Sequence, residues 1–201
     1  MPLLHPAFFS PSRTDLRSAD LRSLVPERFL GDDSDLIDLP DLRDLAARLA
    51  GAPELWRTLT RHDPQRRWYT RLVLSGSVEV WLICWYPGQQ TAIHDHGGAL
   101  GALAVAEGTV EEDECGPDWT VTRTLRHGAG THVGFGHDHV HRVANRGTRP
   151  ATTIHAYSPP ELPLRYAPSA RQAADTVVRS VVQAGSARSG GGSGTRVGAP
   201  A

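Results

Sequence analysis

The chain of 201 residues is short of cysteine and has almost no net charge. Its two cysteines, Cys84 and Cys115, are too few for a disulfide scaffold, so we expect free thiols in a reducing compartment. Basic residues number 21 and acidic residues 22, a formal net charge of -1. This balance provides no overall attraction to nucleic acid or to an anionic membrane. These shortages favour a cytoplasmic protein with a small-molecule partner.

The sequence also lacks long apolar stretches. No segment approaches the roughly 20 consecutive apolar residues that a membrane-spanning helix needs, so no membrane partner is expected. The first residues lack the basic region and the apolar stretch of a secretory signal peptide, and none is predicted. A hydrophobic fraction of 39% with 21% charged residues is typical of a globular protein, and the length suits one domain.

Three regions differ in their residue pattern. Residues 1–60 predict a helical segment, in which a helix begins at Pro40, places Leu42, Leu45 and Leu49 on one face, and ends at Gly51. Residues 61–168 predict a β domain that carries the functional site. Residues 169–201 predict a short helix to about residue 184, followed by a disordered Gly/Ser-rich tail that cannot bury a core.

The middle region contains short runs rich in β-branched and aromatic residues, separated by glycines and prolines. They predict strands over residues 71–74, 78–86, 100–106, 120–125, 131–135, 140–144 and 152–157. Many short strands with no long helix between them favour an antiparallel sandwich or a small barrel. The expected fold class is therefore mainly β.

The 10 histidines are unevenly distributed, and two of them form a His94-Asp95-His96 sequence. Side chains at i and i+2 of a strand point to the same face, so this pair can meet one metal ion. Imidazole suits zinc, copper, iron or nickel, so the pair alone does not name the metal. A pair of surface histidines is the alternative interpretation.

The flanking glycines add to this signal. Gly88 precedes His94 with five residues between them, and Gly108 follows twelve residues after His96. This spacing resembles the first motif of the cupin superfamily, G-x5-H-x-H-x(3,4)-E-x6-G. Cupins are double-sheet β-barrels that hold a metal ion between strands, which agrees with the predicted strands.

A second cupin motif, G-x5-P-x-G-x2-H-x3-N, is partly matched. Gly130, His141 and Asn145 fit it, whereas Gly136 and Asp138 replace its Pro and its second Gly. Because His137, His139 and His141 alternate, periodicity alone leaves all three open as a third ligand. Only the motif register selects His141. We interpret the remaining histidines as structural or surface residues: His5, His62, His127, His132, His137 and His139.

The first motif lacks its carboxylate, because Leu100 and Gly101 stand where the glutamate ligand is expected. Three neutral histidines leave a divalent ion with its full charge and with open coordination positions. Such a site favours an anionic substrate ligand, and a thiolate is a strong candidate.

Five segments in the same order resemble the cysteine dioxygenases, a thiol-oxidising branch of the cupins. The resemblance covers about residues 66–160 and implies a cupin-type double-sheet β-barrel (a jelly roll) with N-terminal helices. The segments are Trp68-Tyr69-Thr70-Arg71, Ile83-Cys84-Trp85, Ile93-His94-Asp95-His96, His141-Arg142-Val143-Ala144-Asn145 and His155-Ala156-Tyr157-Ser158-Pro159-Pro160.

The resemblance implies an enzyme, a non-heme iron cysteine dioxygenase. Ferrous iron would be bound by His94, His96 and His141. L-Cysteine would bind the iron through its thiolate and amine, O2 would bind beside it, and the product would be cysteine sulfinate.

The resemblance also implies roles for residues around the metal. Arg71 would hold the substrate carboxylate by a charge-assisted pair, supported by Tyr69. Tyr157 would place its hydroxyl near the bound sulfur and oxygen, His155 would orient Tyr157, and Thr153 would orient His155. Without the resemblance, we would interpret Arg71 as a solvated strand residue and Tyr157 as an aromatic residue of the core.

Two further features are implied by the family. The Ser158–Pro159 peptide bond is expected to be cis. Animal members carry a cysteine that crosslinks to the tyrosine, and Gly101 occupies that register here, so Tyr157 is expected to remain a free phenol.

Three alternative functions stay open at this point. The first is dioxygenation of another small thiol acid such as 3-mercaptopropionate, although related enzymes with that preference tend to carry Gln where Arg71 stands. The second is a cupin that binds metal without turnover. The third is a zinc or manganese isomerase, which the missing carboxylate disfavours. The sequence does not determine the oligomeric state.

Overall fold

The structure is a computed structural model that describes residues 3–4, 24–31 and 36–168. The helix and tail predicted over residues 169–201, and His5, lie outside the described residues. The helical elements are η2 (Glu27–Phe29), α2 (Leu39–Ala50), α3 (Pro53–Trp56) and η3 (Arg57–Leu59). The strands are β1 (Leu3–Leu4), β2 (Trp68–Leu74), β3 (Glu79–Trp85), β4 (His94–Asp95), β5 (Leu100–Glu107), β6 (Thr109–Cys115), β7 (Val121–Gly128), β8 (His132–Phe135), β9 (Val140–Ala144), β10 (Ala151–Ser158) and β11 (Arg165–Tyr166).

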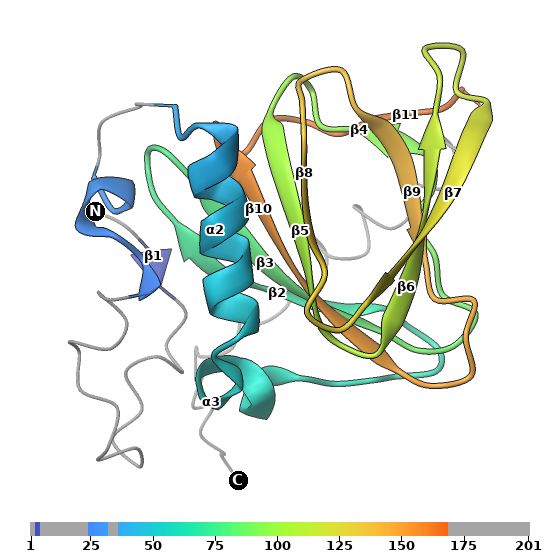
Figure 1. The fold of residues 1–201 in the computed structure, drawn as a ribbon, viewed down its shortest axis with the longest axis horizontal. Helices are drawn as coiled ribbons and strands as arrows, with labels where there is room; N and C mark the ends of the chain where they lie inside the picture. Colours follow the sequence, from blue (N-terminus) through green and yellow to red (C-terminus); the bar gives the residue numbers. More distant parts are fainter. Residues whose placement is uncertain (1–2, 5–23, 32–35, 169–201) are drawn as a thin grey trace, which may run out of the picture.

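The strands form two antiparallel sheets that face each other (Figure 1). The first sheet has the order β1-β2-β3-β10-β5-β8 and the second β11-β4-β9-β6-β7. Strands far apart in the sequence lie side by side, since β10 pairs with both β3 and β5. This arrangement is a jelly roll. The predicted fold class, mainly β with a cupin-type double sheet and N-terminal helices, is confirmed.

Strand β5 shows how the first sheet is buried on both faces. Leu103 and Val105 belong to the core cluster between the two sheets, whereas Ala102 and Ala104 belong to the cluster that contains α2. Successive side chains of a strand point to opposite faces, so one short sequence serves both cores. The small alanine side chains let the helix pack closely on the sheet. Figure 1 shows α2 lying across the outer face of this sheet.

Helix α2 forms where the sequence predicts it. The side chain of Asp38 caps its first turn by accepting a hydrogen bond of 2.9 Å from the backbone N–H of Asp41. The leucines Leu42, Leu45 and Leu49 are fully buried against the sheet. Each contributes roughly 1.5–3 kcal/mol relative to an exposed side chain, so the apolar stripe holds the helix in place.

Strand β6 was not predicted from the sequence. Its central residues, Glu111 to Glu114, are all acidic, a composition depleted in strands. The strand nevertheless lies inside the second sheet, between β7 and β9. Its buried members Glu112 and Asp113 are paired with histidines and arginines from neighbouring strands. Pairing across the sheet therefore offsets the cost of burying these charges.

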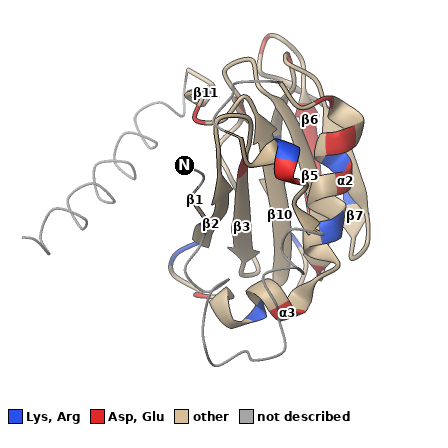
Figure 2. Cartoon of the chain, turned by 90° about the vertical axis from the view of Figure 1, so that its left-hand side faces the viewer, with Lys and Arg blue, Asp and Glu red and all other residues tan. Residues whose placement is uncertain are grey.

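Charged side chains are scarce on the strands that face α2. Strand β10 carries none, and β3 carries only Glu79, whereas the helices and loops carry many (Figure 2). No helix in the described part of the chain is long and apolar enough to cross a membrane. Both cysteines are free thiols, as predicted, and burial raises the pKa of the Cys84 thiol.

Candidate metal centre

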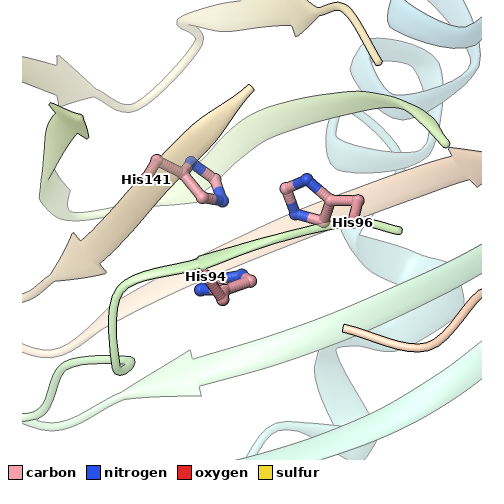
Figure 3. Close-up of side chains that lie close together, drawn as sticks. All are labelled: His94, His96 and His141. Atoms are coloured by element: carbon pink, nitrogen blue, oxygen red, sulfur yellow. The ribbon is translucent and has the colours of Figure 1, made fainter. Parts of the chain in front are cut away.

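Three histidines from different parts of the second sheet converge (Figure 3). His94 lies on β4 directly opposite His141 on β9, and His96 follows immediately after β4. Their ring centroids are 4.8 to 5.1 Å apart, and their candidate ligand nitrogens lie within 4.8 Å of one another. All three side chains are buried. The structure thus brings together the three predicted ligands.

The hydrogen bonding of these rings fits a bound metal ion. Nδ1–H of His94 donates to the carbonyl of Ala92 at 2.9 Å, which leaves Nε2 as the free donor atom. Both ring nitrogens of His96 are buried without a hydrogen-bond partner in the described part of the protein. An unpaired buried nitrogen is costly, so it calls for a ligand. Coordination of a metal ion by His96 would remove that cost.

His141 is held by a carboxylate behind it. Its Nδ1–H donates to Oε1 of Glu112 at 2.6 Å, and this leaves Nε2 free on the side of His94 and His96. A carboxylate that accepts from a ligating histidine fixes the tautomer and orientation of the ring and makes the other nitrogen a better donor. Glu112 lies on the acidic strand β6, which explains why sequence analysis missed it.

Glu112 accepts hydrogen bonds from two further histidines. His127 Nε2 lies 2.9 Å from its Oε2, and His139 Nε2 lies 2.9 Å from its Oε1. Burial would raise the pKa of Glu112, but the hydrogen bonds from His127, His139 and His141 outweigh it and hold the pKa well below its usual range. Glu112, His139 and His141 also lie close enough to form a metal cluster. The carboxylate already accepts three hydrogen bonds, so we interpret it as a support for His141.

The three candidate ligands are neutral at physiological pH. Burial lowers the pKa of His94 to about 3, and the electrostatic effect of nearby His141 also acts to lower it. Burial also lowers the pKa of His96 and of His141, although Glu112 opposes it at His141. Metal binding needs deprotonated imidazole nitrogens, so this environment favours the ligating form.

A hydrogen-bonded chain leads through β10 to Tyr157. Trp85 Nε1–H donates to the hydroxyl of Thr153 at 2.8 Å, and this hydroxyl lies 2.8 Å from Nε2 of His155. Nδ1 of His155 lies 3.2 Å from the hydroxyl of Tyr157. The Tyr157 ring stacks on His96, with centroids 4.8 Å apart. Burial raises the pKa of Tyr157 above its ordinary value, so it stays protonated.

Arg71 is already engaged by carboxylates. Its Nη1 donates to Oε1 of Glu161 at 2.8 Å and lies 3.7 Å from Oε2 of Glu79. The guanidinium lies over the ring of Trp81 at 5.2 Å, and Tyr69 packs edge-on against the same ring. Arg71 and Tyr69 therefore share a platform, but sequence analysis did not foresee the two glutamates.

These side chains line one cavity of about 960 Å³. Its wall includes the three histidines, the three residues predicted to bind the substrate, and one arginine that sequence analysis missed: His94, His96, His141, Arg71, Tyr69, Tyr157 and Arg67. The missed arginine had a signal, because Arg67, Tyr69 and Arg71 alternate and therefore share a face.

Two features of the family resemblance are seen in the backbone. The Ser158–Pro159 peptide bond is cis, as expected. Gly101 lies directly opposite Tyr157 across β5 and β10. A Cβ atom at Gly101 would come within 1.9 Å of the Phe135 ring, which fills the space beside the glycine.

A jelly roll with three neutral imidazoles converging between its sheets defines a metal-binding cupin. The chain belongs to the cysteine dioxygenase type I family, whose family model matches residues 18–166. The family implies a dioxygenase that acts on a small molecule with O2 and needs a metal ion, and the ion's identity is not given by imidazole ligands alone.

Individual relatives agree with this assignment. The chain is 28% identical over 158 residues to cysteine dioxygenase type 1 of Rattus norvegicus, covering 71% of this chain and 74% of that protein. It is 30% identical over 142 residues to cysteine dioxygenase type 1 of Danio rerio, covering 63% and 68%. A solved protein from Klebsiella pneumoniae with a double-stranded β-helix domain is 17% identical, with a TM-score of 0.49 over 55% of this chain and 91% of that one. The two antiparallel sheets of this chain define its fold.

Proposed function

We propose that this protein is an iron-dependent thiol dioxygenase that converts L-cysteine and O2 to cysteine sulfinate. Both oxygen atoms of O2 become bonded to sulfur, so the thiolate becomes a sulfinate and no other reductant is needed. The convergence of His94, His96 and His141, all neutral and with no carboxylate among them, carries this proposal.

The proposed metal ligands suit a substrate that brings its own negative charge. His94, His96 and His141 would hold Fe²⁺, which supplies the redox chemistry of the reaction when bound. Three neutral ligands leave the charge of the ion uncompensated, and a substrate thiolate would neutralise part of it. Glu112 would keep His141 in the orientation that directs Nε2 into the cavity.

Arg71 is proposed to bind the substrate carboxylate, supported by Tyr69 through their common contact with Trp81. Glu161 must leave Arg71 for this to happen. Its side chain is 61% exposed, and such a surface ion pair is worth only about 0–1 kcal/mol, so its displacement costs little free energy.

We expect Arg71→Ala to raise the KM for L-cysteine at least about tenfold, because a charge-assisted hydrogen bond is lost. Iron content should not change; equal loss of iron would contradict this role.

Tyr157 and His155 are proposed to act on the substrate side of the metal. The Tyr157 ring stacks on His96 and so lies beside the proposed ion, where its hydroxyl can donate a hydrogen bond to bound substrate. His155 holds that hydroxyl through its Nδ1, and Thr153 fixes His155 from behind. The hydrogen bonds from Thr153 through His155 to Tyr157 thus hold the hydroxyl proton of Tyr157 in place.

The function is tested by oxygen uptake of the ferrous-loaded protein with L-cysteine, run beside 3-mercaptopropionate, with the sulfinate product quantified. Uptake matched by cysteine sulfinate and weak with the second thiol is the expected result. A preference for 3-mercaptopropionate would keep the metal site and overturn the substrate. No uptake with either thiol at full iron loading would indicate a cupin that binds metal without turnover. Metal analysis of protein purified without added metal tests the choice of iron.

A further inference from the structure

The cavity contains a second guanidinium that the proposed mechanism does not use. Arg67 immediately precedes β2 and lines the cavity together with Arg71. Its Nη1 donates to the backbone carbonyl of Gln90 at 2.7 Å, and its guanidinium carbon lies 5.1 Å from the ring centroid of Trp85. The side chain is therefore held in a defined place in the wall of the cavity.

Arg67 has no negative partner among the described residues. No described carboxylate lies within ion-pair distance of it, and its Nε is buried without any hydrogen-bond acceptor. Burial lowers the pKa of Arg67. A half-buried cation without an ion-pair partner is costly to the folded protein, and an anionic ligand would offset that cost.

Arg71 differs from Arg67 because it already has carboxylate partners. Arg71 is paired with Glu161 at 2.8 Å and lies 3.7 Å from Glu79, so that end of the cavity holds two negative charges against one positive charge. The other end of the cavity is lined by Arg66, which is exposed, and by Arg67, which is half-buried, and no described carboxylate forms an ion pair with either. The less solvated of these uncompensated positive charges is at Arg67.

Arg67 also lies on the metal side of the cavity. Trp85, the ring beneath its guanidinium, donates the hydrogen bond that begins the Thr153–His155–Tyr157 chain. The three proposed ligand histidines line the same cavity as Arg67, so an anion that binds at them shares this cavity with its guanidinium.

We propose that Arg67 is a further substrate-binding residue that selects thiols carrying a carboxylate over thiols without one. Its guanidinium offers a positive charge to the anionic end of the substrate, in addition to Arg71. This inference rests on the proposed function for its substrate class, a small thiol acid. It assigns a role in recognition that none of the family segments indicated.

The test compares binding of two thiols that differ in the carboxylate. Iron-loaded protein is titrated without oxygen in a calorimeter with L-cysteine and with cysteamine, which lacks the carboxylate. Arg67→Gln should weaken L-cysteine binding about tenfold or more, the loss expected for a hydrogen bond to a charged group, and change cysteamine binding less than about threefold. Arg67→Lys keeps the charge without the planar fork and should give an intermediate loss.

Arg66→Gln is the matched control, because it removes the same charge from the adjacent, exposed residue at the rim of the same cavity. It should leave both affinities within about threefold of wild type. Equal weakening of both thiols by Arg67→Gln, or no weakening of L-cysteine, would overturn the role of Arg67. Selective weakening without oxygen uptake by the wild type would support Arg67 and overturn the dioxygenase function instead. Failure of the wild type to bind L-cysteine would overturn both.

Discussion

Glu112 is the residue on which three histidine side chains depend. Its carboxylate accepts hydrogen bonds from His127, His139 and His141, and only the last of these is a proposed metal ligand. A single buried charge thus organises the side of the metal centre that faces away from the substrate. Loss of this charge should weaken metal binding, because the hydrogen-bonding partner of a ligating imidazole affects how strongly that imidazole binds the metal ion.

Glu112→Gln tests this dependence. The amide keeps the shape of the side chain but removes its charge, so we expect metal affinity to fall roughly 10- to 100-fold. Competition with a chelator of known affinity measures the change. Glu111→Gln, on the same strand and paired with Arg146 outside the metal centre, serves as the control and should bind metal as the wild type does. A similar loss in both variants would mean that β6 is disturbed as a whole.

Glu161 competes with the substrate for Arg71. Since its carboxylate occupies Nη1 of Arg71 in the substrate-free protein, Glu161→Gln should lower the KM for L-cysteine by up to about fivefold and leave kcat unchanged. Steady-state oxygen uptake measures both constants. Glu114→Gln removes a carboxylate that is also paired with an arginine, Arg123, but on the second sheet, and should change neither constant. A raised KM in Glu161→Gln would show that Glu161 positions Arg71 instead of blocking it.

At the scale of the elements, the contact between β5 and β8 fixes the shape of the cavity. Gly101 on β5 pairs with Phe135 on β8 and faces Tyr157 on β10. The Phe135 ring lies over Gly101, stacks on His96 with centroids 4.9 Å apart, and so couples the two sheets at the metal centre. The absence of a side chain at Gly101 is what allows this ring to lie there.

Gly101→Ala should therefore destabilise the fold. The added methyl group would overlap the Phe135 ring, and such overpacking typically costs about 1–3 kcal/mol in the free energy of unfolding. Urea denaturation measures the change. Gly128→Ala on β7 is the control, because its added methyl group would meet nothing within 4 Å. The double variant with Phe135→Leu should recover part of the loss. No effect of Gly101→Ala would contradict the close packing described here.

At the scale of the whole molecule, the buried neutral histidines make stability depend on pH. Burial lowers the pKa of His155 to about 3, whereas an unfolded histidine titrates near 6.5. Between these values the unfolded chain takes up a proton that the folded protein does not. The contribution of neutral His155 to the free energy of unfolding is therefore complete above about pH 6.5, and it is lost progressively as the pH falls towards 3.

We predict that His155 affects how steeply the free energy of unfolding depends on pH. The free energy of unfolding of the wild type should fall on acidification below pH 6.5, with His155 contributing up to about 1.4 kcal/mol per pH unit. In His155→Gln this part of the slope should disappear. Urea denaturation of metal-free protein at pH 7, 6 and 5 measures it, and His132→Gln at an exposed position should keep the wild-type slope. Parallel curves for wild type and His155→Gln would show that His155 is protonated in the folded protein.

Much of the fold and of the candidate site was predictable from local patterns. The alternation of apolar residues identified most of the longer strands, and Pro40 and Gly51 bounded α2 within one residue. Motif spacing selected His94, His96 and His141, which the structure brings together. Periodicity, caps and short motifs allow such predictions because they join residues that are close in the sequence.

Strand β6 and the pairs around it were not predictable in the same way. Without knowledge of its partners, a run of acidic residues predicts a solvated loop. One partner of Glu112 is His141, which is 29 residues away in the sequence. Arg71 and Glu161 are 90 residues apart, so no local pattern indicates that the proposed carboxylate-binding residue already holds a carboxylate.

The sequence by itself determined the class of fold through short-range periodicity, and the family through five short segments in order. It also predicted His94, His96 and His141 as metal donors from motif spacing. Only the tertiary structure decided which charges are compensated. It placed Glu112 behind His141, paired Arg71 with Glu161, and left Arg67 without a described carboxylate partner. Electrostatic partners are chosen by distance in space, and the crossing of the chain between two sheets sets those distances.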